Sequence, residues 1–160
     1  MPVLYAADSV AGALMETVLH DVPYPSEGYQ HDLDRHLKSD LQASTISIRR
    51  QLTVVDLTKL GLQRMNIRPS QMFETNKPDY PRTREWALWL RQASPKAQGL
   101  MWMSARNPES KAIMLFGDRV PADAVVPSHP EDSLPLHDPL VYEQLLILLA
   151  RLGCGVAPNR

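Results

Sequence analysis

The stretch that decides the fold is PVLYAADSVAGALMETVLHDVP, residues 2–23. Its short apolar run, Val3–Ala6, predicts a strand. Asp8 or Ser9 then supplies the N-cap of an amphipathic helix over Val10–His20. The proline that closes the stretch stops the helix, because proline cannot continue a helical hydrogen-bond ladder. We therefore expect a strand and a helix, joined by a short turn, to form the floor of a site.

Two side chains of this stretch are candidates for that site. Tyr5 stands at the end of the predicted strand, and Glu16 stands in the middle of a helix whose other residues are mostly apolar. A charge among apolar residues needs a partner or a function. From the residues alone, the simpler interpretation is a half-buried strand tyrosine and a solvent-exposed helix carboxylate.

Composition indicates one ordinary globular domain. The chain has 160 residues, of which 44% are hydrophobic and 22% charged, and its formal net charge is −1. We expect a single domain over residues 1–160, and the balanced charge gives no reason to expect a nucleic-acid or membrane partner. Cys154 is the single cysteine and cannot form an intrachain disulfide. Because no signal peptide follows Met1, we expect a cytoplasmic protein.

The rest of the chain predicts an α+β fold, with a mixed sheet flanked by helices. Helices are expected over residues 32–43, 59–65, 83–93 and 139–152, and strands over 45–48, 52–57, 99–104 and 112–116. The first two strands are close enough to form a hairpin, or two strands with a bulge. The last helix is apolar nearly all round and should be buried. The proline-rich segment 121–139 should be a wrapping loop.

The aromatic residues are best explained by packing. Trp86 and Trp89 fall near one face of the helix over 83–93 and should belong to the core. Trp102 should point away from Met101 and Met103, because successive side chains of a strand alternate between its two faces.

Motifs of well-known sites are missing from the sequence. It holds no glycine-rich phosphate loop, no GxSxG, no HExxH and no CxxC. The five histidines do not stand in metal-ligand spacing, and His31 and His36 are too far apart to share one helical face. We therefore expect no metal site.

Five segments in order carry a resemblance to a known family: LYAADS-x4-LMETVLHDVP, LTVVDLTKLGL, YPRTREWALWL, GLMWMS and LFGDRV. On these segments the chain resembles the RES-domain family, which is named for an arginine, a glutamate and a serine. Its members are typically toxins of bacterial toxin–antitoxin pairs. The resemblance implies an ADP-ribosyltransferase-like fold, NAD as the substrate, and an Xre-type helix-turn-helix antitoxin as the partner.

The resemblance also assigns three site residues. Tyr5 would lie against the nicotinamide end of NAD, and Glu16 and Ser104 would be the family's catalytic and NAD-binding glutamate and serine. These residue types suit the chemistry, because a carboxylate stabilises a ribose with oxocarbenium character. A tyrosine face can stack on nicotinamide, and a serine can hydrogen-bond the carboxamide or a ribose hydroxyl. By itself, a serine at a strand end is more often a turn residue.

The sequence departs from the family's pattern in one respect, because the family's arginine is missing. In relatives it stands shortly before the LYAA strand, and this chain begins too soon to contain it. We expect either a true start upstream of Met1, or a fold that lacks its first strands and has lost much of its NAD affinity. Arg106 and Arg119 are the nearest replacement cations for the pyrophosphate, although neither stands in the missing place. Missing strands would leave an open sheet edge that favours self-association into a homo-oligomer.

Two functions follow. The first is an NAD-consuming toxin that cleaves the nicotinamide–ribose bond, with water, phosphate or a protein as the acceptor of ADP-ribose. The enzyme would be an NAD glycohydrolase, a phosphorylase or an ADP-ribosyltransferase, provided that the missing segment is present in the full protein. The alternative is a degenerate, non-catalytic RES-like protein that serves as a binding or interaction module.

Overall fold

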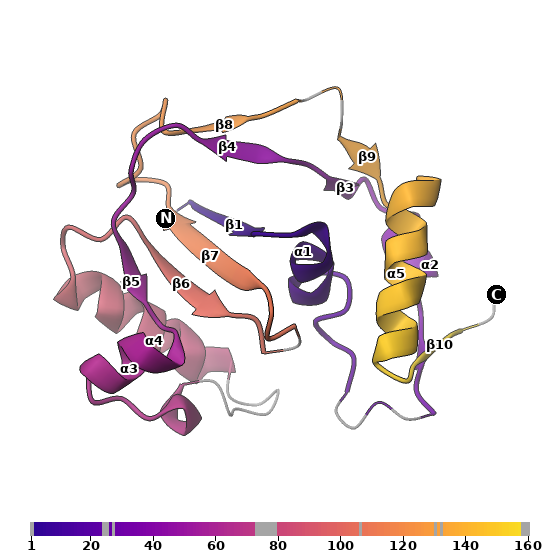
Figure 1. The fold of residues 1–160 in the computed structure, drawn as a ribbon, viewed down its shortest axis with the longest axis horizontal. Helices are drawn as coiled ribbons and strands as arrows, with labels where there is room; N and C mark the ends of the chain where they lie inside the picture. The colour runs from indigo at the N-terminus through magenta and orange to yellow at the C-terminus, as the bar shows by residue number, and fades with distance from the viewer. Residues whose placement is uncertain are drawn as a thin grey trace.

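The sheet at the centre of the fold contains four strands in the order β1-β7-β6-β5 (Figure 1). Its strands are β1 (Val3–Ala7), β5 (Val54–Asp56), β6 (Gly99–Met103) and β7 (Lys111–Phe116). β7 is antiparallel to both β1 and β6, and β5 is parallel to β6, so the predicted mixed sheet is confirmed. The computed structural model describes residues 2–23, 26, 28–72, 80–105, 107–129, 131 and 133–157.

One face of this sheet is covered by two helices. Leu100 of β6 pairs with Met114 of β7, so both side chains lie on the same face. That face packs against α3 (Lys59–Arg64) and α4 (Tyr80–Ala93), and Phe116 completes this first hydrophobic cluster. Both helices were predicted. α4 begins three residues earlier than expected, since a proline is accepted in the first turn of a helix.

Strand alternation decides which side chains reach the covered face. Trp102 packs against the first cluster, whereas Met101 and Met103 belong to the opposite face, which confirms the prediction. Tyr5 pairs with Met114 and therefore shares the covered face. In Figure 1, however, α3 and α4 lie beside β5 and β6, at the far end of the sheet from β1. Tyr5 is consequently left 62% exposed.

The two tryptophans of α4 have different surroundings. Trp86 packs against the first cluster, as predicted. Trp89 is more than half exposed, and its ring meets that of Trp86 edge-on, with ring centroids 5.5 Å apart. The prediction that Trp89 belongs to the core is wrong, because the buried stripe of the helix runs through Trp86 and Leu90 and leaves Trp89 beside it.

The helix of the quoted stretch, α1 (Val10–Glu16), is shorter than predicted. Ser9 is its N-cap. The helix ends at Glu16 and does not reach His20, because the backbone of Thr17 leaves the helical conformation with φ −120° and ψ −79°. The prediction that Glu16 lies in the middle of the helix is therefore wrong, and this carboxylate is its last residue.

The C-terminal helix, α5 (Pro139–Arg151), begins and ends close to where the sequence predicts. The Asp138 side chain accepts the N–H of Leu140 at 3.0 Å, and Gly153 adopts a positive φ of 70° after the helix. α1 and α5 pack together in a second hydrophobic cluster, which includes Leu14, Val18, Leu19, Leu33, Leu145, Leu148 and Leu149. The prediction of burial on all sides is wrong, since Leu140 is 68% exposed and Leu146 and Ile147 are also exposed.

Two short ladders run along the top of Figure 1 toward α5. β4 (Ile46–Ile48) pairs with β8 (Val125–Pro127), and β3 (Gln42–Ala43) pairs with β9 (Leu134–Pro135). Both ladders are antiparallel and join segments that are far apart in the sequence.

These ladders correct two predictions. The expected hairpin between residues 45–48 and 52–57 is wrong, because β4 pairs with β8 while β5 enters the central sheet beside β6. The expected loop over 121–139 is wrong in part, because it contains β8 and β9. An alternating pattern predicts that a strand exists but does not identify its partner, and the partner here is distant.

The remaining elements are short. β2 (Gln30–His31) pairs in parallel with β10 (Gly155–Val156), and η1 (Pro69–Gln71) follows α3. α2 (Asp34–Leu37) is a single turn, so the helix predicted over 32–43 is wrong for most of its length. The residues after this turn lead into β3 instead. In the described part of the chain, none of the helices has the length and apolar character that a bilayer crossing requires.

Candidate functional site

Two of the predicted site residues belong to segments that meet at one end of the central sheet, since Glu16 ends α1 and Ser104 follows β6, whereas Tyr5 lies in the middle of β1. β1 and β6 both run antiparallel to β7, so their carboxyl ends lie at the same end of the sheet. α1 begins there, directly after β1, and the loop from Ser104 to Ser110 connects β6 to β7 there. Two segments that are about a hundred residues apart in the sequence therefore lie side by side.

Ser104 is buried in this loop and is only 2% exposed. Its hydroxyl oxygen accepts the N–H of Asn107 at 3.1 Å, and its own N–H donates to the carbonyl of Ser110 at 2.9 Å. Both bonds shape the loop. In this conformation, Ser104 acts as a turn residue, which is the simpler of the two interpretations that the sequence allowed.

Glu16 is half-buried and lies four residues after Gly12. Residues at this spacing share one face of a helix, and helical side chains lean toward the N-terminal end of their helix. Gly12 is the residue by which α1 touches the loop, since a β-carbon there would lie 1.9 Å from the hydroxyl oxygen of Ser110. The face of α1 that carries Glu16 is therefore the face that meets Ser110.

A chain of hydroxyl groups joins α1 to the loop. The N–H of Gly12 donates to the hydroxyl oxygen of Ser9 at 3.0 Å, and this oxygen lies 3.0 Å from that of Ser110. Ser110 donates its proton to Asp8 Oδ1 at 2.6 Å. Since that proton is used, the Ser9 hydroxyl must donate to Ser110. The chain thus runs from Gly12 through both serines to the carboxylate of Asp8.

The environment of Asp8 favours its ionised form. The hydroxyl of Ser110 is the largest cause that lowers the pKa of Asp8, and the backbone of Lys111, acting on the same carboxylate, lowers it further. Sequence reasoning treated Asp8 only as a candidate N-cap and missed Ser110 altogether. Nothing in the local sequence distinguishes Ser110 from other loop serines, because its partners come from the opposite end of the chain.

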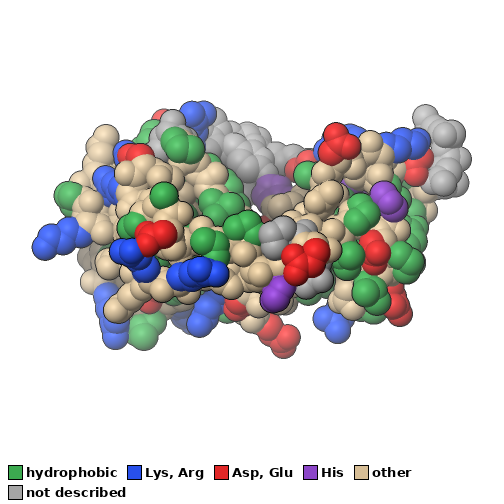
Figure 2. All heavy atoms as spheres, turned by 90° about the horizontal axis from the view of Figure 1, so that it is seen from above, with side chains coloured by type: hydrophobic (Ala, Val, Ile, Leu, Met, Phe, Trp, Pro, Cys, Tyr) green, Lys and Arg blue, Asp and Glu red, His purple; other side chains and the backbone are tan. Residues whose placement is uncertain are grey.

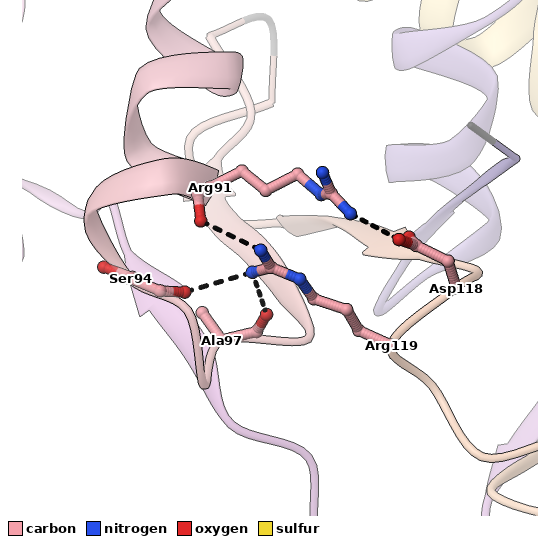
Figure 3. A network of polar contacts seen from close by, with 5 residues as sticks. All are labelled: Arg91, Ser94, Ala97, Asp118 and Arg119. Atoms are coloured by element: carbon pink, nitrogen blue, oxygen red, sulfur yellow. Dashed lines mark hydrogen bonds and ion pairs between the residues drawn. The ribbon is translucent and has the colours of Figure 1, made fainter.

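Arg119, a candidate cation for the pyrophosphate, is committed to the fold (Figure 3). Its guanidinium donates to the carbonyl oxygens of Arg91, Ser94 and Ala97 over 2.9 to 3.1 Å. It thereby closes the C-terminal end of α4, where carbonyl groups have no partner within the helix. The same guanidinium lies 5.5 Å from the ring centre of Phe116. These contacts leave Arg119 poorly placed to grip a phosphate.

Arg91 completes the network in Figure 3. It forms an ion pair with Asp118 and lies 5.4 Å from the ring centre of Phe116. Two guanidinium groups thus pack on one buried aromatic ring, which is a favourable arrangement for cations that must be partly desolvated. Arg106, the other candidate cation, lies outside the described residues.

Two grooves on the described surface lie away from the predicted site residues. One of about 500 Å³ is lined by residues of β5 and the loop after α4, and one of about 540 Å³ is lined by α3 and the segment after it. Neither is lined by Tyr5, Glu16 or Ser104. Both are open and lack convergent titratable groups, so we place the site by its chemistry and not by the size of these grooves.

His31 and His36 form a stacked pair, with ring centres 5.8 Å apart. His31 is buried and donates from Nε2 to the carbonyl of Val18 at 3.1 Å. Burial is the largest cause that lowers the pKa of both histidines. Among the residues that the structure describes, no group of three metal-ligating side chains occurs.

The surface seen in Figure 2 carries mixed charge. Lys and Arg side chains and Asp and Glu side chains are both distributed over this face, with apolar side chains between them. A phosphate backbone is bound by a continuous positive surface, which this face does not present.

The comparisons with known proteins support the resemblance. No curated protein and no solved structure gave a significant match, so the likeness to ADP-ribosyltransferases stays a prediction. The model of the RES-domain family, however, matches residues 1–137, which is most of the chain. The chain therefore belongs to the RES-domain family.

Proposed function

We propose that this protein is an NAD-consuming toxin of a toxin–antitoxin pair. Membership of the RES-domain family supports the proposal. The observation that carries it is the placement of Glu16, which is half-buried on the face of α1 that meets the β6–β7 loop. A carboxylate at that position is partly shielded from bulk water, and its electrostatic effect on a developing positive charge is therefore larger than it would be in solvent.

In the proposed reaction, the bond between ribose C1′ and nicotinamide N1 breaks. Nicotinamide leaves with the electron pair as a neutral molecule, and the ribose develops oxocarbenium character. The Glu16 carboxylate stabilises that charge. Water then adds to C1′ and loses a proton, which gives ADP-ribose. Phosphate or a protein nucleophile would serve as the acceptor in the same way.

Tyr5 is suited to hold the nicotinamide end. Its side chain is exposed beside the helix-covered part of the sheet, so a planar ligand can stack on the phenol ring without moving a core residue. Ser104 would contact NAD only after its loop rearranges, because its hydroxyl is buried and engaged with Asn107. For the pyrophosphate, Arg106 stays the candidate from sequence.

The direct test is nicotinamide release by the purified protein, followed by chromatography. We expect turnover in the wild type and a loss of about 10²-fold in Glu16→Gln, which keeps the shape of the side chain and removes its charge. Glu143→Gln, on the exposed part of α5, is the matched control and should retain full activity. Unchanged turnover in Glu16→Gln would show that this carboxylate has no part in the reaction.

The degenerate, non-catalytic module remains as a second candidate. Two observations favour it. Ser104 is buried and Arg119 is bonded to backbone carbonyl groups, so neither of these candidate NAD-binding side chains is free to contact a ligand. An NAD titration by calorimetry separates the two candidates. Micromolar binding with turnover supports the enzyme, whereas no binding at millimolar NAD supports the module.

An Xre-type helix-turn-helix antitoxin is the proposed partner. It would block access to the exposed edge of β1 and to Tyr5. Co-expression with a neighbouring helix-turn-helix gene should relieve growth arrest and yield a complex that elutes as one species. Growth arrest that persists in the presence of every neighbouring gene of this kind would contradict the partnership.

A further inference from the structure

Ser110 connects the loop that contains Ser104 to the beginning of α1, the helix that carries Glu16. Its carbonyl accepts the N–H of Ser104 at 2.9 Å, and its N–H donates to the carbonyl of Asn107 at 2.8 Å. Its hydroxyl reaches the opposite way, to Asp8 and Ser9. The residue is only 2% exposed. One buried side chain thus joins the β6–β7 loop to the turn between β1 and α1.

The contact with α1 is unusually close. A β-carbon at Gly12 would lie 1.9 Å from the hydroxyl oxygen and 2.8 Å from the β-carbon of Ser110. Only glycine allows the helix to approach this far, so the helix and the serine fix one another's position. Glu16 lies one turn further along the same face, and any shift at Gly12 is passed to its carboxylate.

Asp8 anchors this arrangement from the other side. Its N–H donates to the carbonyl of Lys111 at 3.0 Å, which continues the β1–β7 ladder, so its backbone is held by the sheet. Its side chain is exposed and accepts the proton of Ser110. A hydrogen bond to an ionised acceptor is shorter and stronger than one between neutral groups, which agrees with the 2.6 Å distance.

We propose that Ser110, held by Asp8, is a positioning residue that sets the Glu16 carboxylate for catalysis. This inference rests on the proposed function. It assigns Ser110 and Asp8 no contact with NAD. Their effect is transmitted through Gly12 and the rigid turn of α1, and a displacement of about 1 Å at a reacting group can cost about 10²-fold in rate.

The expected signature is a fall in kcat without a change in KM. The interaction of Glu16 with ribose strengthens only as positive charge develops, so misplacement weakens the transition state more than the bound substrate. We expect Ser110→Ala to lower kcat by about tenfold or more, with KM for NAD within about twofold of wild type. Asp8→Ala should have the same effect, and the double variant should be no worse than either.

Two variants separate positioning from general stability. Asp8→Asn keeps an acceptor oxygen for Ser110 and should restore kcat to within about threefold of wild type. Ser26→Ala is the matched control, since Ser26 is also buried and donates its hydroxyl proton to a backbone carbonyl, that of Leu152, away from the site. It should lower the melting temperature about as much as Ser110→Ala and leave kcat unchanged. If Ser110→Ala does not fold, Asp8→Ala provides the same test from an exposed position.

The outcomes are distinguishable when Glu16→Gln is measured in the same assay. Wild-type turnover, loss in Glu16→Gln and full kcat in Ser110→Ala and Asp8→Ala would overturn the positioning role and leave the proposed function intact. Equal losses in Ser110→Ala and Ser26→Ala would also overturn it, because the effect would then follow stability alone. Absence of NAD turnover in the wild type would overturn both proposals.

Discussion

The two edge strands of the central sheet differ in how far the rest of the protein covers them. β5 is covered by α3 and α4, and the residue that follows it, Leu57, is buried in the first cluster. β1, at the other edge, exposes Val3, Leu4 and Tyr5 by 41%, 39% and 62%. An apolar strand that is left uncovered is a site where another molecule can bind. The comparison teaches that one edge of the sheet is packed into the fold, whereas the other leaves the candidate residue Tyr5 exposed.

The largest difference in stability between the two edges is expected on substitution of Phe116. This side chain is fully buried under α4, and Phe116→Ala should lower the free energy of unfolding by about 3–5 kcal/mol, through lost burial and the cavity left behind. Tyr5→Ala, on the same face of the sheet but at the exposed edge, should change it by less than about 1 kcal/mol. Denaturant unfolding monitored by tryptophan fluorescence measures both. Equal losses would mean that β1 is as structural as β7.

Substitution of Arg119, which donates to three carbonyl oxygens at the C-terminal end of α4, should have the next largest effect on stability. Arg119→Met removes three hydrogen bonds from a charged donor and should cost about 2 kcal/mol of unfolding free energy. Arg119→Lys should recover little of it, because an ammonium group cannot reproduce the planar fork. Arg50→Met, which removes an exposed ion pair with Asp123, is the control and should cost well under 1 kcal/mol. A tolerated Arg119→Met would free this residue for a role in binding.

Substitutions at the exposed strand β1 should change the affinity for NAD and leave the free energy of unfolding nearly unchanged. Tyr5→Ala should weaken NAD binding by about threefold to tenfold, through loss of aromatic stacking, whereas Tyr5→Phe keeps the ring and should bind as wild type does. Calorimetric titration against NAD measures the difference. If Tyr5→Phe binds as weakly as Tyr5→Ala, the phenol hydroxyl and not the ring face makes the contact.

The pH dependence of stability should come from the α1–α5 half. Burial lowers the pKa of His31, and protonation would place an N–H at Nδ1, which is buried and has no hydrogen-bond partner among the described residues. The unfolded state therefore binds the proton first, so stability is full above the ordinary histidine pKa of about 6.5 and falls as pH drops through the lower folded pKa. His31→Gln should flatten this dependence between pH 7 and 5, compared with exposed His137→Gln. An unchanged slope would place the titrating group elsewhere.

Self-association at β1 should be the weakest effect. The N–H of Asp8 and the carbonyl of Pro2 bond to the β7 side, so by alternation the backbone groups of Val3, Tyr5 and Ala7 face outward. We expect concentration-dependent oligomers, measured by sedimentation, that Leu4→Lys suppresses by charging the free edge. Leu140→Lys, on the exposed face of α5, is the control. Suppression by Leu140→Lys alone would locate the contact on α5.

Local signals in the sequence predicted much of the secondary structure. The cap at Ser9 depends on a contact within a few residues, so the sequence is sufficient to find it. The apolar runs of β6 and β7 are also visible in the sequence. The partner of β4 was missed because alternation is the same whichever strand lies opposite, and β8 was missed because its proline-rich segment shows no alternation. The length of α1 was overestimated because apolar residues after Glu16 continue the pattern while the backbone leaves the helix to bury Val18 and Leu19.

The sequence by itself determined the family, the residue types of the candidate site, and the strand and helix that carry Tyr5 and Glu16. Only the tertiary structure decided that Ser104 is buried, that Arg119 closes a helix, and that Ser110 reaches Asp8 and Gly12. Residue type and spacing along the chain are local properties, and a sequence displays them directly. Contacts across about a hundred residues depend on how the strands pair and how closely the helix approaches the sheet, and these arise only when the whole chain packs.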